Sequence, residues 1–169
     1  MKYIFPLLNI LLFLVSCQEQ KLNHKETVGR YYDDFDAGNY DMIKATINDC
    51  ITQVSGDFVT TYSRDGFYEF FKWDSIFKSP YEIIEMEKEN DHLSVTVAQK
   101  NFRYEFLRNN LLRYKVKVSF TSGKIFKLED LEYIDTNWGV WNKEKDSLVG
   151  WLRNNHPDLD SFFNEWIYR

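Results

Sequence analysis

The stretch YKVKVSF, residues 114–120, decides the fold class of this chain, because apolar and polar side chains alternate along it without a break. Alternation with a period of two puts the apolar side chains on one face of a β-strand and the polar ones on the other. Thr121-Ser122-Gly123 follows with residues typical of a tight turn, and Lys124 to Tyr133 continues as an extended segment. The sequence therefore predicts a β-hairpin with one buried face.

The sheet is expected to extend upstream of this hairpin. Two further long strands are predicted, separated by Asn90-Asp91 and followed by the turn Arg108-Asn109-Asn110. They run from Tyr81 to Glu89 and from His92 to Leu107. The length of the second strand favours a bulge near Lys100, which would let the sheet curve. Ile51 to Thr61 contains Gly56 and is interpreted as two short strands or an irregular hairpin.

Three helices are predicted ahead of the long strands. The first runs from about Lys25 to Gly38, a residue that can adopt the left-handed conformation that often closes a helix. Its apolar stripe has three- and four-residue spacing and comprises Val28, Tyr31, Tyr32 and Phe35. The second helix covers Tyr40 to about Asn48, and the third covers Asp65 to Pro80. Helices followed by hairpin-linked strands define the α+β class.

The C-terminal segment 136–169 has a different character and is predicted to be a helical extension. It holds four of the five tryptophans, Trp138, Trp141, Trp151 and Trp166. Lys143 to Asn154 has a helical pattern, His156-Pro157 interrupts it, and Asp158 can cap a final helix to about Tyr168. We expect so many tryptophans to pack over the sheet or across the mouth of a cavity.

The N-terminal segment predicts where the protein is located. Tyr3 to Val15 is an apolar run behind Lys2, but its 13 residues fall short of the about 20 that a membrane-spanning helix needs. Residues 1–16 are therefore interpreted as a signal peptide. Leu14-Val15-Ser16-Cys17 resembles the lipobox of bacterial lipoproteins, which implies that Cys17 carries the lipid.

Lipidation at Cys17 would make residues 17–24 a lipidated tether. Two or more acyl chains hold a protein stably on a membrane without any spanning segment, so the membrane is an expected partner. Gln18 stands where an Asp would favour retention in the inner membrane. The expected location is therefore the bacterial cell envelope, with the outer membrane favoured over the inner.

Composition limits the classes of function. The net charge is −5 and no patch of clustered lysine and arginine occurs, which argues against a nucleic-acid partner. Cys50 is the only cysteine besides Cys17, and it is expected to be a small buried residue. The histidines lack the spacing of metal ligands, and no phosphate-binding loop or nucleophile motif is present, so neither a metal nor a cofactor is predicted. Aromatic residues make up 18%, which suits an aromatic core or an aromatic-lined cavity.

Two motifs resemble those of the nuclear transport factor 2-like, or SnoaL-like, superfamily. Arg30-Tyr31-Tyr32 followed by Phe35-x-Ala37-Gly38-Asn39-Tyr40-Asp41 is similar to the end of its first helix, and Arg64-Asp65-Gly66 with Phe70-Phe71 is similar to its third helix. The resemblance covers residues 25–135. It implies a cone, in which a curved antiparallel sheet packs on three N-terminal helices around a cavity. The residues expected to line this cavity are Tyr31, Phe35, Phe67, Phe71, Tyr104 and Tyr114.

The resemblance carries little about activity, since the superfamily includes isomerases, cyclases, dehydratases and non-catalytic binders. In a comparison with ketosteroid isomerase, Tyr31 falls at the tyrosine of the oxyanion hole. Ser55 and Val116 fall where that enzyme has its two acids. A shift of two residues in register would bring Asp57 to the position of the base. We therefore expect an aromatic hollow that is poor in proton-transfer groups.

The sequence favours a lipid-anchored, non-catalytic domain that binds a small apolar ligand or a protein partner. The alternative is a small-molecule isomerase or hydrolase-like enzyme that uses Tyr31 with Asp57 or Asp49. A third possibility is a structural or immunity-type partner protein with a filled core. The outer face of the sheet, on which Lys115 and Lys117 are expected to lie, could support a homodimer.

Overall fold

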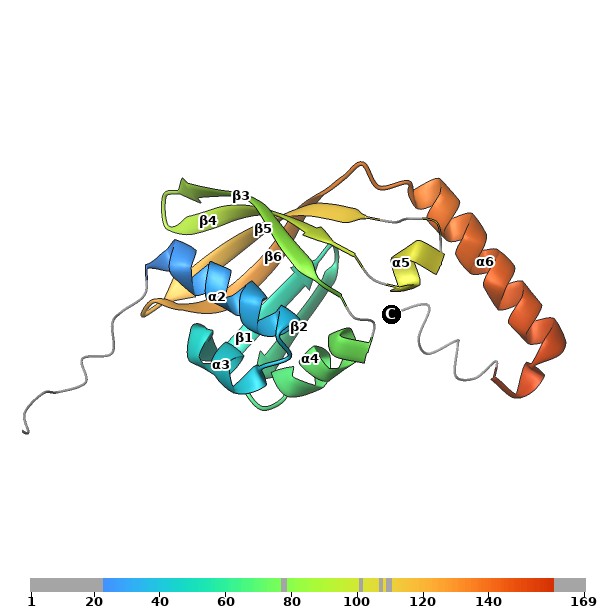
Figure 1. Ribbon diagram of the computed structural model, residues 1–169, viewed down its shortest axis with the longest axis horizontal. Helices are drawn as coiled ribbons and strands as arrows, with labels where there is room; N and C mark the ends of the chain where they lie inside the picture. The colour runs from blue at the N-terminus through green and yellow to red at the C-terminus, as the bar shows by residue number, and fades with distance from the viewer. Residues whose placement is uncertain (1–22, 77–78, 101, 107, 109–110, 160–169) are drawn as a thin grey trace, which may run out of the picture.

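A curved six-stranded sheet with helices against its inner face forms the body of the molecule (Figure 1). The computed structural model describes residues 23–76, 79–100, 102–106, 108 and 111–159. The strands are β1 (Ile47–Ser55), β2 (Phe58–Ser63), β3 (Tyr81–Glu89), β4 (His92–Gln99), β5 (Leu112–Thr121) and β6 (Lys124–Ile134). The helices are α2 (His24–Asp36), α3 (Tyr40–Thr46), α4 (Phe67–Ile76), α5 (Phe102–Phe106) and α6 (Trp138–Asn155), and a short 3-10 helix, η2, covers Pro157–Leu159. The predicted α+β class is confirmed.

The strands follow the order β2-β1-β6-β5-β4-β3. Four of the five pairs are antiparallel, but β1 and β6 are parallel, so the sheet is mixed where the sequence predicted an antiparallel one. The parallel pair arises because the chain leaves the β1–β2 hairpin through α4 and three more strands before it returns beside β1. Register shifts between Ile83 and Glu85 and between Lys115 and Val116 mark irregularities of the kind that bend a sheet.

The strand predicted from His92 to Leu107 is too long. β4 starts at His92 as predicted but ends at Gln99. Gln99 pairs with Tyr81, the first residue of β3, and with Leu112, the first residue of β5. After Gln99 the Lys100 N–H still donates to the backbone carbonyl of Pro80, just before β3, and the single helical turn of α5 follows from Phe102. The predicted bulge near Lys100 is therefore the end of a strand.

The core lies between α2 and the inner face of the sheet. The apolar stripe of α2 is buried as predicted, and Val116 and Val118 of β5 are buried opposite it, as their alternation requires. Other fully buried side chains come from β1, β4 and α4, among them Ile47, Ile51, Val95, Val97 and Phe67. Gly38, with φ of +68°, ends α2 in the left-handed conformation.

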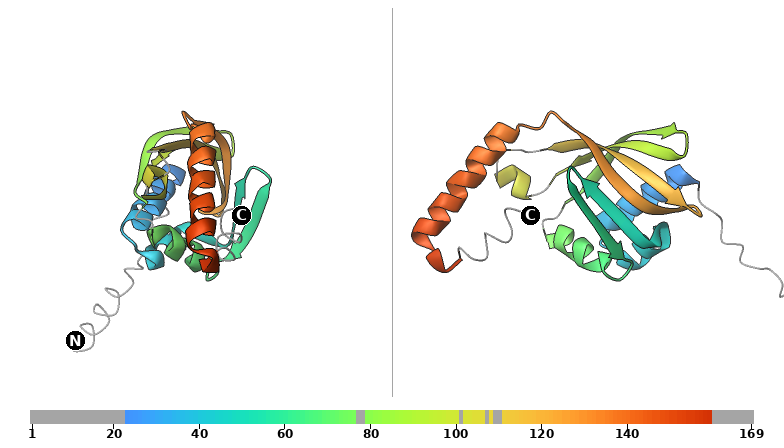
Figure 2. Two further views of the ribbon diagram at one scale, coloured as in Figure 1. Left: turned by 90° about the vertical axis from the view of Figure 1, so that its right-hand side faces the viewer. Right: turned by 180° about the vertical axis from the view of Figure 1, so that it is seen from behind.

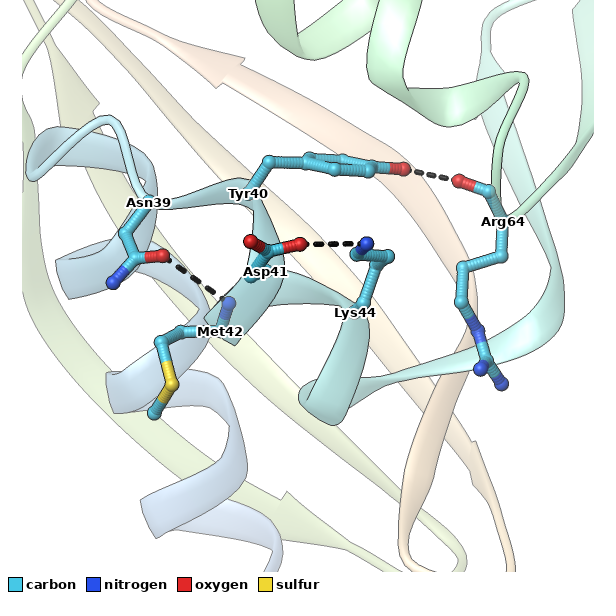
Figure 3. A network of polar contacts seen from close by, with 6 residues as sticks. All are labelled: Asn39, Tyr40, Asp41, Met42, Lys44 and Arg64. Carbon is cyan, nitrogen blue, oxygen red and sulfur yellow. Dashed lines mark hydrogen bonds and ion pairs between the residues drawn. The ribbon is translucent and has the colours of Figure 1, made fainter.

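A small polar network joins α3 to the loop before α4 (Figure 3). Asn39 caps α3 by accepting a hydrogen bond from the Met42 backbone, and the Tyr40 hydroxyl donates to the backbone carbonyl of Arg64. The Arg64 guanidinium also pairs with Asp49 on β1. These contacts fix α3, β1 and the start of α4 relative to one another.

Cys50 is exposed on β1, although the sequence suggested a buried position. Its neighbour Ile51 is fully buried, so Cys50 falls on the opposite face of the strand. The register of β1 against β6 shifts between Ile47 and Thr52, which made this face hard to predict from the local pattern.

Helix α6 of the C-terminal extension begins at Trp138, five residues before the predicted helix start, and lies beyond α5 at one end of the molecule (Figures 1 and 2). Trp138 packs edge-to-face on Tyr133 at the end of β6, with ring centroids 5.2 Å apart. Trp166 and most of the final predicted helix lie outside the described residues. No helix in the described ranges has the length and apolar character that a membrane crossing requires.

Candidate functional site

A hollow of about 310 Å³ opens between α2, α4 and the inner face of the sheet, at the end of the domain where α5 follows β4. We call this space the hollow. Its walls combine aromatic rings with a few polar groups. They comprise Tyr31, Tyr32, Phe35, Gln53, Val54, Ser55, Phe70, Trp73, Asp74, Tyr81, Gln99, Arg103, Tyr104, Leu112, Tyr114, Val116, Leu128, Asp130 and Tyr133.

The periodicity of each element explains why these side chains converge. Tyr31 and Phe35 are one helical turn apart on α2, so both project from the face that packs on the sheet. Leu112, Tyr114 and Val116 alternate along β5 and share its inner face. Because the packed core fills the other end of the cone, the free space remains where the strands end.

The first polar cluster surrounds the carboxylate of Asp74 on α4. The Tyr81 hydroxyl donates to Asp74 Oδ2 over 2.6 Å, and the Gln99 side-chain amide lies 3.3 Å from Asp74 Oδ1. Gln99 also donates to the Tyr81 hydroxyl oxygen over 2.9 Å. Burial raises the pKa of Asp74, and the hydrogen bonds from Tyr81, Ser79 and Gln99 offset part of that rise.

The second polar cluster surrounds Asp130 on β6. The Tyr133 hydroxyl lies 2.9 Å from Asp130 Oδ2 and 3.0 Å from Ser55 Oγ, which comes from β1. Burial raises the pKa of Asp130 as well, while hydrogen bonds from Ser55 and Tyr133 lower it. The hollow therefore contains two carboxyl groups that hold their protons more tightly than exposed aspartates do.

Three further tyrosines, Tyr31, Tyr32 and Tyr114, line the hollow together with Tyr81 and Tyr133 of the two clusters. Burial, more than any other cause, raises the pKa of Tyr31, Tyr32, Tyr81 and Tyr114 well above the ordinary value. It also raises the pKa of Tyr133 to about 12. These phenols remain neutral at physiological pH, so they offer hydroxyl donors and ring faces without negative charge.

The residues predicted to line a cavity divide into two groups. Tyr31, Phe35, Tyr104 and Tyr114 lie on the wall of the hollow. Phe67 and Phe71 lie in the packed core beneath it, with Phe67 fully buried and 6.1 Å from the Phe35 ring centroid. Phe70, which lies between them on α4, lines the hollow instead. The inward-facing stripe of a helix is about 100° wide, so residues at its edge can face the hollow while those at its centre face the core.

The aspartates considered for catalysis lie elsewhere. The Asp49 side chain is 87% exposed and pairs with Arg64. Asp57 is exposed in the turn between β1 and β2. Neither residue lines the hollow, so the geometry gives no support to a mechanism that pairs Tyr31 with Asp57 or Asp49.

The expectation of a hollow poor in proton-transfer groups was wrong, because Asp74 and Asp130 enter it. The sequence contained a signal for both. Asp74 follows Phe70 by four residues and therefore falls on the same helical stripe. Asp130 follows Leu128 by two residues and therefore falls on the same face of β6. An acidic residue spaced so that it shares a face with buried apolar residues is the pattern that would have identified Asp74 and Asp130.

Metal binding has no geometric basis in the ranges that the structure describes, where no group of three or more His, Cys, Asp or Glu side chains is placed to hold an ion. Asp74 and Asp130 instead accept hydrogen bonds from neutral tyrosines. The hollow therefore presents aromatic ring faces beside two acidic groups.

Solved structures show the fold to which this arrangement belongs. The chain is similar to a putative ketosteroid isomerase from Kribbella flavida, with a TM-score of 0.56 and 10% identity over 68% of this chain and 79% of that one. It is similar to an NTF2-like protein of unknown function from Cytophaga hutchinsonii, with a TM-score of 0.52 and 12% identity over 67% and 92%. A cystatin-fold protein from Novosphingobium aromaticivorans gives a TM-score of 0.56 and 11% identity over 66% and 99%.

The chain therefore has the nuclear transport factor 2-like fold that its motifs predicted. At these identities the likeness concerns the fold alone. No protein-family model matches the sequence, and no curated protein is similar to it.

Proposed function

We propose that this protein is a lipid-anchored domain of the bacterial cell envelope whose hollow binds one small, largely aromatic or apolar molecule. The observation that carries the proposal is the hollow itself, which combines a volume of about 310 Å³ with tyrosine-rich walls and a few convergent polar groups. Concave sites of this size and lining are typical of small-molecule binding. A purely structural partner protein would not need such a space in its core.

The position of the hollow suits a domain held by its N-terminus. α2 begins at His24, whose ring stacks on Phe120 near the turn between β5 and β6. The hollow touches the other end of α2, and Phe35 lies about 16 Å from His24 along the helix axis, given a rise of 1.5 Å per residue. A lipid on Cys17 would hold the closed end of the cone toward the membrane and leave the hollow facing away from it.

A second candidate function is a proton-transfer enzyme that acts on the bound molecule. The observation that favours it is the presence of Asp74 and Asp130 in the hollow. A carboxylate whose pKa is raised by burial is a stronger base than an exposed one, and a neutral tyrosine can donate a hydrogen bond to a developing oxyanion. This candidate uses Asp130 or Asp74 in place of Asp57 or Asp49.

Binding can be tested with N-phenyl-1-naphthylamine, a neutral arylamine whose fluorescence rises in apolar sites. The mature chain, produced without its lipid, is expected to bind it saturably with one site. Leu112→Trp places a larger side chain on the wall of the hollow and should weaken binding at least tenfold. Leu131→Trp, at a residue that is 51% exposed, is the matched control and should bind like the wild type. A wild type that shows no saturable binding would contradict the proposal.

The enzyme candidate can be separated from the binding function by isotope exchange. β-Tetralone, an aryl ketone with acidic α-protons, is incubated with the protein in D₂O and followed by proton NMR. Catalysed exchange in the wild type that is lost in Asp130→Asn or Asp74→Asn supports an enzyme. Binding without exchange supports the non-catalytic function.

A further inference from the structure

The acidic groups of the hollow point to the chemical class of its ligand. Asp74 comes from α4 and contacts Tyr81 of β3 and Gln99 of β4, whereas Asp130 comes from β6. Each carboxylate accepts hydrogen bonds only from neutral side chains, a tyrosine among them. An ionised carboxylate has about four acceptor sites, so each one keeps acceptor capacity for a bound molecule.

Neither Asp74 nor Asp130 takes part in an ion pair with another residue of the described ranges. Within the described ranges, every ion pair joins other residues, and most of these pairs lie at the surface. Arg103 is the basic residue among those that line the hollow, and its guanidinium lies over the ring of Trp141, 5.5 Å from the centroid. Charges away from water are normally paired, so the hollow favours an incoming positive charge.

The tyrosine rings add a second favourable interaction for a cation. Tyr32 and Tyr81 have ring centroids 5.2 Å apart, and Tyr114 and Tyr133 have centroids 6.1 Å apart. All four rings belong to the wall of the hollow. Organic ammonium groups are attracted to the faces of aromatic rings, and sites that recognise them combine such rings with carboxylates. An anion would instead meet two acidic groups and the negative faces of the rings.

We propose that the ligand of the hollow is an organic cation, an ammonium group attached to an aromatic or apolar body, held by Asp74 and Asp130 among the tyrosine rings. This inference rests on the proposed binding function and names the class of molecule that the same site takes. The apolar body contacts Leu112, Val116 and Leu128, which also line the hollow.

The test uses three probes that share a benzyl group but differ in charge. Phenethylamine is a cation at pH 7, 2-phenylethanol is neutral and phenylacetate is an anion. Each is titrated into the mature chain by calorimetry. The amine is expected to bind at least tenfold more tightly than the alcohol, and phenylacetate is expected to bind more weakly than both.

Variants then assign the preference to the two acids. Asp74→Asn combined with Asp130→Asn should reduce the affinity for the amine to that for the alcohol. The matched control combines Asp49→Asn with Asp57→Asn, which removes the same charge from exposed positions and should keep the preference, because surface charges are screened by water and salt. If the first double variant does not fold, the inference is judged from the relative affinities of the wild type for the amine and the alcohol.

The outcomes separate this inference from the proposed function. Equal affinity for the amine and the alcohol overturns the inference and leaves a binding hollow. Loss of the preference in the exposed-site control also overturns it, since the selectivity would then come from overall charge. Failure of all three probes to bind overturns the inference and the proposed function together.

Discussion

The Tyr133 hydroxyl lies 2.9 Å from the Asp130 carboxylate inside the hollow, and the same hydroxyl lies 3.0 Å from Ser55 Oγ. This contact joins the end of β6 to β1, the pair of strands that runs parallel. It also holds down the pKa of Asp130 against the effect of burial. One side chain therefore contacts both β1 and an acidic group of the hollow.

Replacement of Tyr133 by Phe should raise the pKa of Asp130 further, because the variant removes a donor that favours the ionised carboxylate. The change is followed by carbon NMR of the aspartate carboxyl groups during a pH titration. Tyr62→Phe, at a tyrosine of β2 that does not line the hollow, should leave the titration of Asp130 as it is. An unchanged or lower pKa in Tyr133→Phe would contradict the assigned contact.

Asp74 should make the stability of the protein depend on pH. Its pKa is raised in the folded state above the ordinary value of 3.8, so the folded protein binds the proton more tightly than the unfolded chain. The contribution of Asp74 to stability then falls as the pH rises from about 3.8 through the folded-state pKa, and it is constant above that. Asp74→Asn removes this dependence, so the free energy of unfolding of the variant, relative to wild type, should increase with pH over that window.

Urea unfolding at a series of pH values from about 3.5 to about 7.5 measures this difference. Asp57→Asn, in the exposed β1–β2 turn, controls for loss of a negative charge, and surface changes of this kind are usually within about 0.5 kcal/mol. A relative stability of Asp74→Asn that stays flat across the series would show that Asp74 is not perturbed by its surroundings.

Much of the fold could be predicted from the sequence because its signals are local. The alternation along β5, the apolar stripe of α2 and the turn residues at Gly38 and Ser122-Gly123 each depend on nearest neighbours in the chain. The parallel pairing of β1 with β6 and the end of β4 at Gln99 depend on which strand arrives alongside. That information is not local, so the pattern within each segment could not supply it.

The site was only partly predictable for a related reason. Tyr31, Phe35 and Tyr114 were found because aromatic residues on a buried face are conspicuous. Asp74 and Asp130 were missed because an acid is normally assigned to the surface, and only their spacing from Phe70 and Leu128 indicates an inward position. Whether an inward aromatic side chain meets a core or a hollow depends on packing across the whole sheet.

The capping box at the start of α2 should contribute measurably to stability. Asn23 accepts a hydrogen bond from the Glu26 backbone, and the Glu26 carboxylate accepts one from the Asn23 backbone over 2.9 Å. Asn23→Ala should cost about 1 kcal/mol of unfolding free energy, measured by urea unfolding. Glu26→Gln keeps the acceptor oxygen and should cost less. An Asn23→Ala variant as stable as wild type would contradict a formed cap.

The hydrogen bond from Tyr40 to the Arg64 carbonyl should also be visible in stability (Figure 3). Tyr40→Phe keeps the ring, which packs on Tyr68 and Phe71, but leaves the carbonyl without this donor. The expected loss is about 1 kcal/mol. Asp41→Asn, which weakens the exposed pair with Lys44, is the control and should change stability by about 0.5 kcal/mol or less. Equal losses of stability in the two variants would contradict a stabilising hydrogen bond from Tyr40 to the Arg64 carbonyl.

The lipobox at Cys17 predicts that the protein is attached to the membrane. Cys50, the other cysteine of the chain, provides an internal control for this prediction. Cells producing the full chain are grown with an alkyne-tagged fatty acid, and the protein is expected to carry the label. Cys17→Ala should lose it, whereas Cys50→Ala should keep it, although Cys50 is exposed and chemically available.

The linkage distinguishes the proposed lipoprotein modification from ordinary thiol acylation. An acyl chain on the amine of Cys17 is an amide, and a diacylglycerol on its sulfur is a thioether, so label in the amide survives neutral hydroxylamine. Label that hydroxylamine removes would indicate a thioester, as S-acylation at Cys50 would produce. Since stable anchoring takes two or more chains, the labelled wild type should also remain with the membrane fraction at high salt, and Cys17→Ala should be released from it.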